Sequence, residues 1–155
     1  MSATPSQTVG PFFSLGLADR DLGGPARIEG RVFDGAGDPV PDAMVEVWQA
    51  DETGSYRGDF GWGRSATDAD GRYAFTTVKP GPVEGQASHL VVLVFARGLL
   101  KPLLTRLYFP DAGADPVLDA LDDDERETLI ARADGDSLKF DIRLQGDRQT
   151  TFFAL

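Results

Sequence analysis

Hydrophobic and polar residues alternate over several short stretches of this chain. The clearest stretch is 138–144, where apolar residues occupy every second position: Leu138, Phe140, Ile142 and Leu144. Because the side chains of a strand point alternately to opposite faces, this period predicts a strand with one face on a core. Related patterns predict further strands at 28–32, 45–49, 73–76, 89–96 and 103–108.

The stretch 89–96 differs from the others because apolar residues fill both of its faces. That pattern predicts a strand that is buried on both sides. Turn residues separate the predicted strands, at Asp34–Pro39, Asp68–Gly71 and Pro80–Pro82. Glycine tolerates positive φ and proline cannot donate to a strand ladder, so we expect the strands to end at these segments.

One short helix is predicted near residues 122–133. Asp122 is a suitable N-cap and Glu125 stands three residues later, which is the spacing of a capping box. Leu129 and Ile130 supply an apolar stripe. The segment is also rich in acids, which we interpret as a solvated helix face.

Short strands, turns and a single helix together predict an all-β fold, namely a two-sheet β-sandwich. The chain has 155 residues and shows neither a linker nor an internal repeat, so we expect one domain over 1–155. In this interpretation residues 1–26 form an extended N-terminal arm. A β-sandwich does not by itself name a function.

Composition narrows the classes of function. With 25 acidic and 15 basic residues the net charge is −10, which argues against nucleic acid or an anionic membrane as a partner. The chain has no cysteine, which excludes disulfides, thiolate metal sites and cysteine nucleophiles. His89 is its one histidine, so this chain alone cannot supply two imidazoles to a metal. We find neither a secretory signal nor a membrane span, and expect a cytoplasmic protein.

Six segments resemble a known family. Residues 45–56, 67–82 and 105–109 resemble the intradiol ring-cleavage dioxygenases, which open catechols between their hydroxyl groups with ferric iron. Residues 4–12, 95–98 and 140–146 resemble the alpha subunits that some members carry beside a catalytic beta subunit. The resemblance spans nearly the whole chain and implies a transthyretin-like (prealbumin-like) sandwich. The chain is short by this comparison, with loops that look trimmed near Gly23, Gly58 and Gly85.

The resemblance also implies where iron ligands would stand. The family holds ferric iron with two tyrosinates and two histidines, at positions that here are Tyr56, Val83, His89 and Val91. An arginine position of the family is Gln86 in this chain. Since two of the four ligand positions are valines, we expect no iron site in this chain. The resemblance instead places Fe(3+) in the beta chain of an alpha–beta hetero-oligomer.

The implied activity is cleavage of protocatechuate by dioxygen to 3-carboxy-cis,cis-muconate, in the β-ketoadipate pathway. By alignment this chain lines the substrate pocket with Thr8, Gly10, Pro11, Phe12 and Arg97. Glycine and proline bring rigid backbone close to a flat ring. Arg97 follows an apolar stretch, where burial would be costly without a partner. It either faces the substrate carboxylate or pairs with an acid of this chain.

Other interpretations stay open at this stage. His89 and Tyr56 fit ordinary structural roles, as a hydrogen-bonded strand histidine and a loop aromatic, and Trp48 and Trp62 fit packing or interface roles. Parts of the chain also resemble transthyretin-like and carboxypeptidase-regulatory-like binding modules, at 34–43 and 68–73. Such a module would not explain the resemblance at either end of the chain. A self-sufficient catechol dioxygenase conflicts with the two valines at ligand positions.

Overall fold

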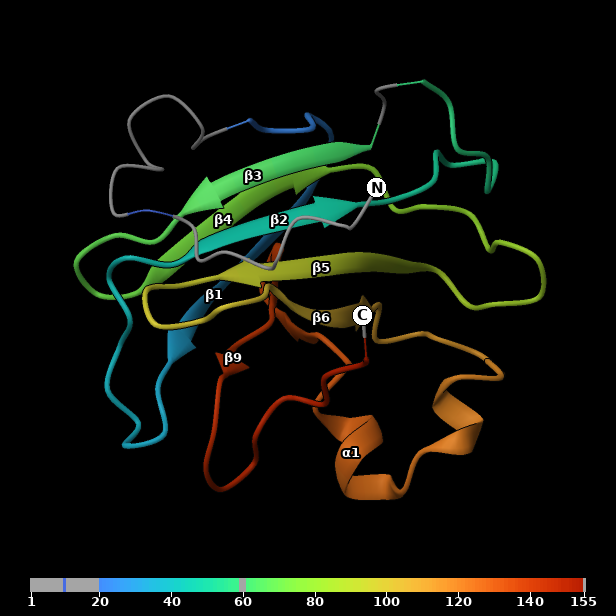
Figure 1. Ribbon diagram of the computed structural model, residues 1–155. Coiled ribbons are helices and arrows are strands. Elements are labelled where there is room, and N and C mark those ends of the chain that lie inside the picture. The colour runs from blue at the N-terminus through green and yellow to red at the C-terminus, as the bar shows by residue number, and fades with distance from the viewer. Residues whose placement is uncertain (1–9, 11–19, 59–60, 155) are drawn as a thin grey trace, which may run out of the picture.

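Two β-sheets pack face to face in the computed structural model of this chain, which describes residues 10, 20–58 and 61–154 (Figure 1). The first sheet has the strand order β4-β1-β8-β7, with β9 also paired to β1, and the second has the order β3-β2-β5-β6. The strands of the first sheet are β1 (Ala26–Phe33), β4 (Arg72–Thr77), β7 (Arg132–Asp134), β8 (Ser137–Lys139) and β9 (Ile142–Arg143). Those of the second are β2 (Met44–Trp48), β3 (Trp62–Ala66), β5 (His89–Phe95) and β6 (Leu103–Tyr108).

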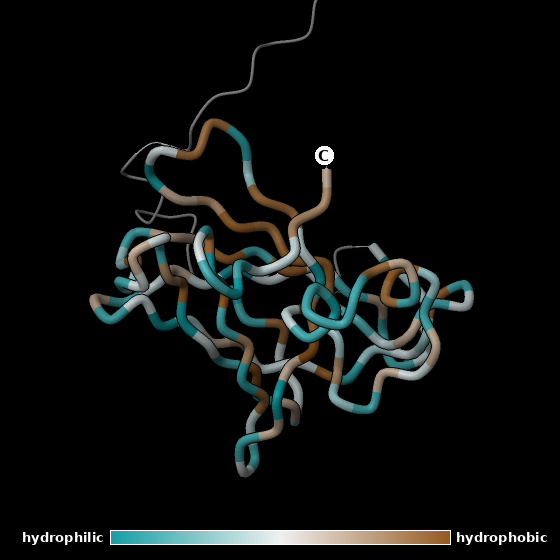
Figure 2. The backbone as a smooth tube through the Cα atoms, turned by 90° about the horizontal axis from the view of Figure 1, so that it is seen from below, coloured by the Kyte–Doolittle hydropathy of each residue, from teal (hydrophilic) through white to brown (hydrophobic). Residues whose placement is uncertain are grey.

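The core lies between the two sheets. Alternate residues of each strand point inward and are almost fully buried, as the period-two pattern predicts. From the first sheet they include Ile28, Val32, Tyr73, Phe75 and Ile142, and from the second Val45, Val47, Leu90, Val92 and Val94. Burying each such side chain contributes about 1.5–3 kcal/mol. Hydrophobic residues accordingly follow the strands through the middle of the molecule, and hydrophilic residues occupy many of the outer turns (Figure 2).

The two-sheet all-β fold is confirmed, and so are the strands predicted at 28–32, 45–49, 73–76, 89–96 and 103–108. The run 138–144 instead forms two short strands that both pair in parallel with β1. The ladder is interrupted at Asp141, whose carboxylate accepts the Arg31 backbone N–H at 3.0 Å. A side chain therefore replaces a backbone acceptor between the two strands.

Two strands, β3 and β7, were not predicted. In β3 the inward positions are Gly63 and Ser65, so the strand has no apolar alternation to recognise. Gly63 is favoured by close packing, because a Cβ there would lie 2.9 Å from the backbone carbonyl oxygen of Arg20 and 2.4 Å from Cδ1 of Leu22. Arg20 pairs with Arg64 through two backbone hydrogen bonds of 2.9 and 2.8 Å, so the described end of the predicted arm runs along β3.

The prediction that 89–96 is buried on both sides is wrong for the described residues. Leu90, Val92 and Val94 are buried in the core, whereas Val91, Leu93 and Phe95 are only half-buried. The second group faces away from the core, because successive side chains alternate between the faces of a sheet. Along β5, the outer face of this sheet is therefore apolar and partly open.

The predicted helix is present but ends earlier than expected. α1 spans Asp123–Glu127 and begins with the predicted capping box, in which Asp122 Oδ1 accepts the Glu125 N–H at 2.8 Å. Leu129 and Ile130 lie beyond it, because the Leu129 carbonyl accepts the Tyr108 N–H at 2.8 Å and so pairs with β6. No α1 residue is buried, so the apolar stripe belongs to the following segment.

A short 3₁₀ turn at Leu118–Ala120 precedes α1. Its residue Leu118 packs with Leu129 and Tyr108 in a small second core. Over the described part of the chain, no helix is long and apolar enough to cross a membrane.

Candidate functional site

The positions that correspond to the two iron-binding histidines lie on the outer face of the β3-β2-β5-β6 sheet. Val91 is paired in register with Trp48 on one side and with Arg106 on the other. Trp48 is in turn paired with Trp62. Directly paired residues share a face, so these four side chains form one row across the sheet.

The next row holds a shielded ion pair. Arg64 Nε lies 2.6 Å from Glu46 Oε2, and the Trp48 indole N–H donates to Glu46 Oε1 at 3.2 Å. The Arg64 guanidinium stacks over the Trp62 ring at 4.6 Å, and the rings of Trp48 and Trp62 are 6.1 Å apart. Both tryptophans therefore act as packing residues for this pair, in agreement with the structural role considered for them.

His89 begins β5 as a buried, hydrogen-bonded residue. Its Nδ1 lies 2.8 Å from the Ala87 carbonyl oxygen. Because a carbonyl only accepts, Nδ1 carries the proton in the neutral ring. Burial is the main cause of the lowered pKa of His89, which keeps the imidazole neutral near pH 7. Its ring packs 5.4 Å from the ring of Tyr108, its partner on β6.

Arg106 places a cation opposite Val91. Its Nη1 donates to Gln86 Oε1 at 2.6 Å and to Tyr108 Oη at 3.0 Å. The Tyr108 hydroxyl donates onward to Asp115 Oδ1 at 3.1 Å. The resemblance assigns an arginine to the position of Gln86, and in this structure the cation beside Gln86 comes from β6.

Asp115 anchors that network from inside the protein. Its carboxylate is fully buried and accepts backbone N–H groups from Ala87, Val117 and Leu118 at 2.9, 2.8 and 3.1 Å. Burial raises the pKa of Asp115, but the hydrogen bonds from Leu118, Val117, Ala87 and Tyr108 together outweigh it and lower the pKa. The carboxylate therefore stays ionised and compensates the nearby Arg106.

These residues do not fit a ferric ion. Val83 and Val91 have no donor atom, and the Tyr56 side chain is 53% exposed in a loop. Arg106 brings a positive charge to the face where a ferric ion would need anionic ligands. Within the described residues, no three histidine, aspartate or glutamate side chains are grouped to hold a metal.

Arg97 lies at the surface, which corrects the expectation that it ends a buried stretch. Its side chain is 75% exposed because β5 stops at Phe95, and Nε lies 2.5 Å from Asp42 Oδ2. The acid partner considered from the sequence is thus present. An exposed pair of this kind contributes about 0–1 kcal/mol, so it holds Arg97 only weakly.

The remaining predicted pocket residues belong to the N-terminal segment. Gly10 is exposed, and a Cβ at its position would have no atom within 4 Å. Thr8, Pro11 and Phe12 lie outside the described residues.

Sequence reasoning missed Arg106 and Asp115. Arg106 was a detectable signal, because it is the one charged residue in the otherwise apolar stretch 103–108. Asp115 gave no such signal, since it stands among ten acids between Asp111 and Asp136.

Comparison with known proteins decides the family. The family model described as "Dioxygenase" matches residues 13–146. This chain belongs to the intradiol dioxygenase family. It is 39% identical to the protocatechuate 3,4-dioxygenase alpha chain of Pseudomonas putida, over 97% of this chain and 95% of that one. The alpha chain of Burkholderia cepacia is 35% identical, over 99% and 98% of the two chains.

The similarity to a catalytic subunit is less complete. The protocatechuate 3,4-dioxygenase beta chain of Burkholderia cepacia is 33% identical, over 77% of this chain and 63% of its own length. The alignment with the Pseudomonas putida alpha chain runs over 191 residues, more than the 155 of this chain. That relative therefore carries residues that this chain lacks.

Solved structures agree with the fold. The dioxygenase domain of a dioxygenase and carbohydrate-binding fusion from Streptomyces sp. SirexAA-E superposes with a TM-score of 0.67 and 32% identity. The match covers 94% of this chain and 99% of that one. Catechol 1,2-dioxygenase from Pseudomonas arvilla C-1 gives a TM-score of 0.59 and 25% identity, over 78% of this chain and 52% of that one.

Proposed function

We propose that this chain is the iron-free alpha subunit of a protocatechuate 3,4-dioxygenase. One observation carries the proposal. This chain matches alpha chains over nearly their full length, yet it has Val83 and Val91 at two of the expected ligand positions, and Arg106 lies beside Val91 on the neighbouring strand. A catalytic subunit could not hold ferric iron with this set of residues. A subunit that only completes the substrate pocket of its partner does not need to hold iron itself.

The partner is a beta chain of the same family, which holds Fe(3+) and performs the chemistry in an alpha–beta assembly. The reaction breaks the bond between the two hydroxyl-bearing carbons of protocatechuate. Dioxygen supplies one oxygen atom to each of the two new carboxylates, so that 3-carboxy-cis,cis-muconate forms without a further reductant. This chain contributes no step at the metal.

The contribution of this chain is one wall of the substrate pocket, made of Thr8, Gly10, Pro11, Phe12 and Arg97. The substrate carries a carboxylate in addition to its two hydroxyl groups, and an arginine is suited to bind it. Arg97 supports this role because its guanidinium is exposed and its pair with Asp42 is weak enough to exchange. Phe12 cannot donate a hydrogen bond to the substrate.

A stand-alone binding module is not favoured. Such a module would not share 35–39% identity with dioxygenase alpha chains from end to end. Co-expression with the beta chain encoded by the same organism separates the two functions. We expect the chains to co-purify and to take up oxygen with protocatechuate. A chain that purifies alone, and does not change the activity of the beta chain, would contradict the proposal.

A further inference from the structure

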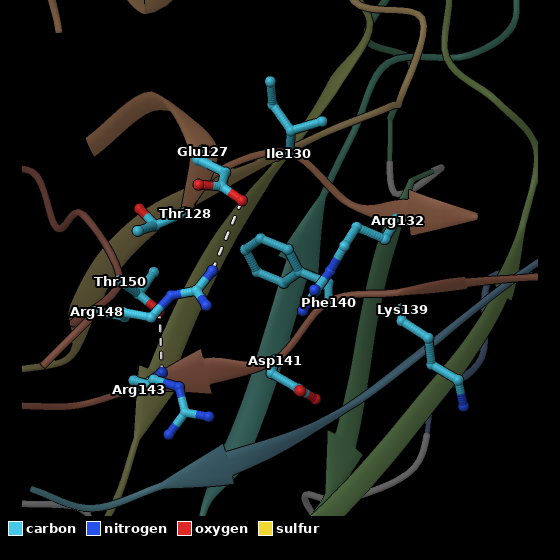
Figure 3. Close-up of a pocket in the computed structure, with 10 residues that line it drawn as sticks. All are labelled: Glu127, Thr128, Ile130, Arg132, Lys139, Phe140, Asp141, Arg143, Arg148 and Thr150. Atoms are coloured by element: carbon cyan, nitrogen blue, oxygen red, sulfur yellow. Dashed lines mark hydrogen bonds and ion pairs between the residues drawn. The ribbon is translucent and has the colours of Figure 1, made fainter. Parts of the chain in front are cut away.

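A basic hollow of about 220 Å³ lies between the end of α1, the β7–β9 region and the C-terminal tail (Figure 3). Arg132 of β7, Arg143 of β9 and Arg148 of the tail line it, and Phe140 lies among them. Figure 3 shows Arg148 and Glu127 reaching toward each other along this hollow. Three arginines from three separate segments thus line one concave place.

Two of these cations, Arg132 and Arg143, have no acidic partner in the part of the chain that the structure describes. Most arginines pair with carboxylates, as Arg57 does with Asp51 at 2.8 Å. Among the described residues, the Arg132 side chain makes no hydrogen bond or ion pair, although its backbone pairs with Lys139 of β8. The Arg143 guanidinium stacks over the Phe33 ring at 4.7 Å and has no carboxylate within 4 Å in the same part of the structure.

The acids that line the hollow do not neutralise this pair. Asp141 keeps its negative charge but forms no ion pair with Arg132 or Arg143 within the described structure, and its carboxylate accepts the Arg31 backbone N–H. Glu127 lies 3.6 Å from Arg148, and both of these side chains are about 70% exposed, so the interaction is weak. Lys139, at the rim, pairs with Glu29 on β1. Arg132 and Arg143 therefore keep their charges available to an anion.

We propose that this hollow binds a small anion with more than one negative charge, either a di- or tricarboxylate or a phosphate. The anion should carry more than one negative charge, because it would accept charge-assisted hydrogen bonds from arginines on different segments. Small size follows from the volume of the hollow and from the net charge of −10, which repels long polyanions. The hollow lies beside β7, β8 and β9 of the first sheet, whereas His89 and Val91 belong to β5 of the second sheet. The inference therefore does not rest on the proposed function.

Titration calorimetry of the full chain, in the assembly in which it purifies, tests this proposal. The probes are tricarballylate and pyrophosphate, with benzoate as a singly charged comparison. We expect one anion to bind per chain, more tightly than benzoate, with an affinity that falls as salt is added. Tighter binding of tricarballylate assigns the site to carboxylates, and tighter binding of pyrophosphate assigns it to phosphates.

Single substitutions then locate the anion. Arg132→Gln and Arg143→Gln should each weaken binding about ten- to hundredfold, because each removes a charge-assisted contact. Arg57→Gln makes the same charge change outside the hollow and should have little effect. Glu127→Gln should tighten binding by up to about fivefold, because it releases Arg148. Absence of binding at millimolar concentration, or equal weakening by Arg57→Gln and Arg132→Gln, would overturn the proposal.

Discussion

Arg106 and Gln86 are joined by a 2.6 Å hydrogen bond in which the guanidinium Nη1 donates to the amide Oε1. Arg106 comes from β6 and Gln86 from the loop before β5, and Arg106 is paired in register with Val91 of β5. Through Tyr108 the same guanidinium reaches the buried carboxylate of Asp115. A network of hydrogen bonds therefore ties the loop before β5 to β6 and to the segment that carries Asp115.

Removing the cation should loosen this network. Arg106→Leu leaves Gln86 and Tyr108 without their charged donor, and we expect a loss of about 1–3 kcal/mol in the free energy of unfolding. For a chain of this size that is a fall of about 2–12 °C in Tm. Arg57→Leu, at an exposed pair, should change Tm little. Equal Tm values for wild type and Arg106→Leu would show that the network contributes nothing.

Acid should destabilise the chain through His89. Burial lowers the pKa of His89 below its usual value of 6.5, so the unfolded chain takes up this proton more readily than the folded one. The contribution of His89 to stability is full above about pH 6.5 and is lost as pH falls through the lowered folded-state pKa. His89→Asn keeps a donor for the Ala87 carbonyl but does not titrate. Between pH 7 and 5, urea unfolding should show a steeper loss for wild type than for His89→Asn; parallel curves would refute this.

Arg97 should affect the choice of substrate. If it binds the carboxylate of protocatechuate, Arg97→Ala in the alpha–beta complex removes about 1.5–3 kcal/mol of binding, roughly ten- to more than a hundredfold in affinity. Catechol, which lacks the carboxylate, should be much less affected. Asp42→Asn is the matched control, because it frees Arg97 and should preserve or improve protocatechuate binding. Equal effects of Arg97→Ala on both substrates would make the arginine a structural residue.

The fold could be predicted from sequence wherever one local rule applied. Patterns of apolar residues revealed β1, β2, β4, β5 and β6, with β5 recognised from a continuous apolar run. The spacing of Asp122 and Glu125 revealed the start of α1. β3 was not predicted because the close backbone of Arg20 favours Gly63 at an inward position, where an apolar side chain would have revealed the strand. The end of α1 escaped because pairing with Tyr108, which stands far away in sequence, overrides the helical pattern.

The site was predictable only in part for a related reason. Val83 and Val91 could be recognised from motif positions alone. The contact between Arg106 and Gln86 depends on the register of β5 and β6 and on the loop before β5, which no local pattern reports. The exposure of Arg97 likewise depends on where β5 ends.

The isolated chain should gain stability from its partner. The outer face of the β3-β2-β5-β6 sheet leaves Trp48 38% exposed beside the half-buried Trp62 and Leu93, a surface of the kind that permanent interfaces cover. We expect the chain alone to self-associate and its Tm to rise when the beta chain is added. A monomer at high concentration, whose Tm does not respond to the beta chain, would argue against a permanent complex.

The most direct test of the alpha-subunit assignment is the iron content and visible spectrum of the purified chain, measured alone and together with the beta chain. We predict that the chain alone is colourless and binds no stoichiometric ferric iron. Val83 and Val91 stand at two of the expected ligand positions, and the positive charge of Arg106 lies beside Val91. The complex should contain iron and show a tyrosinate-to-iron charge-transfer band. The same band from this chain alone would contradict the account.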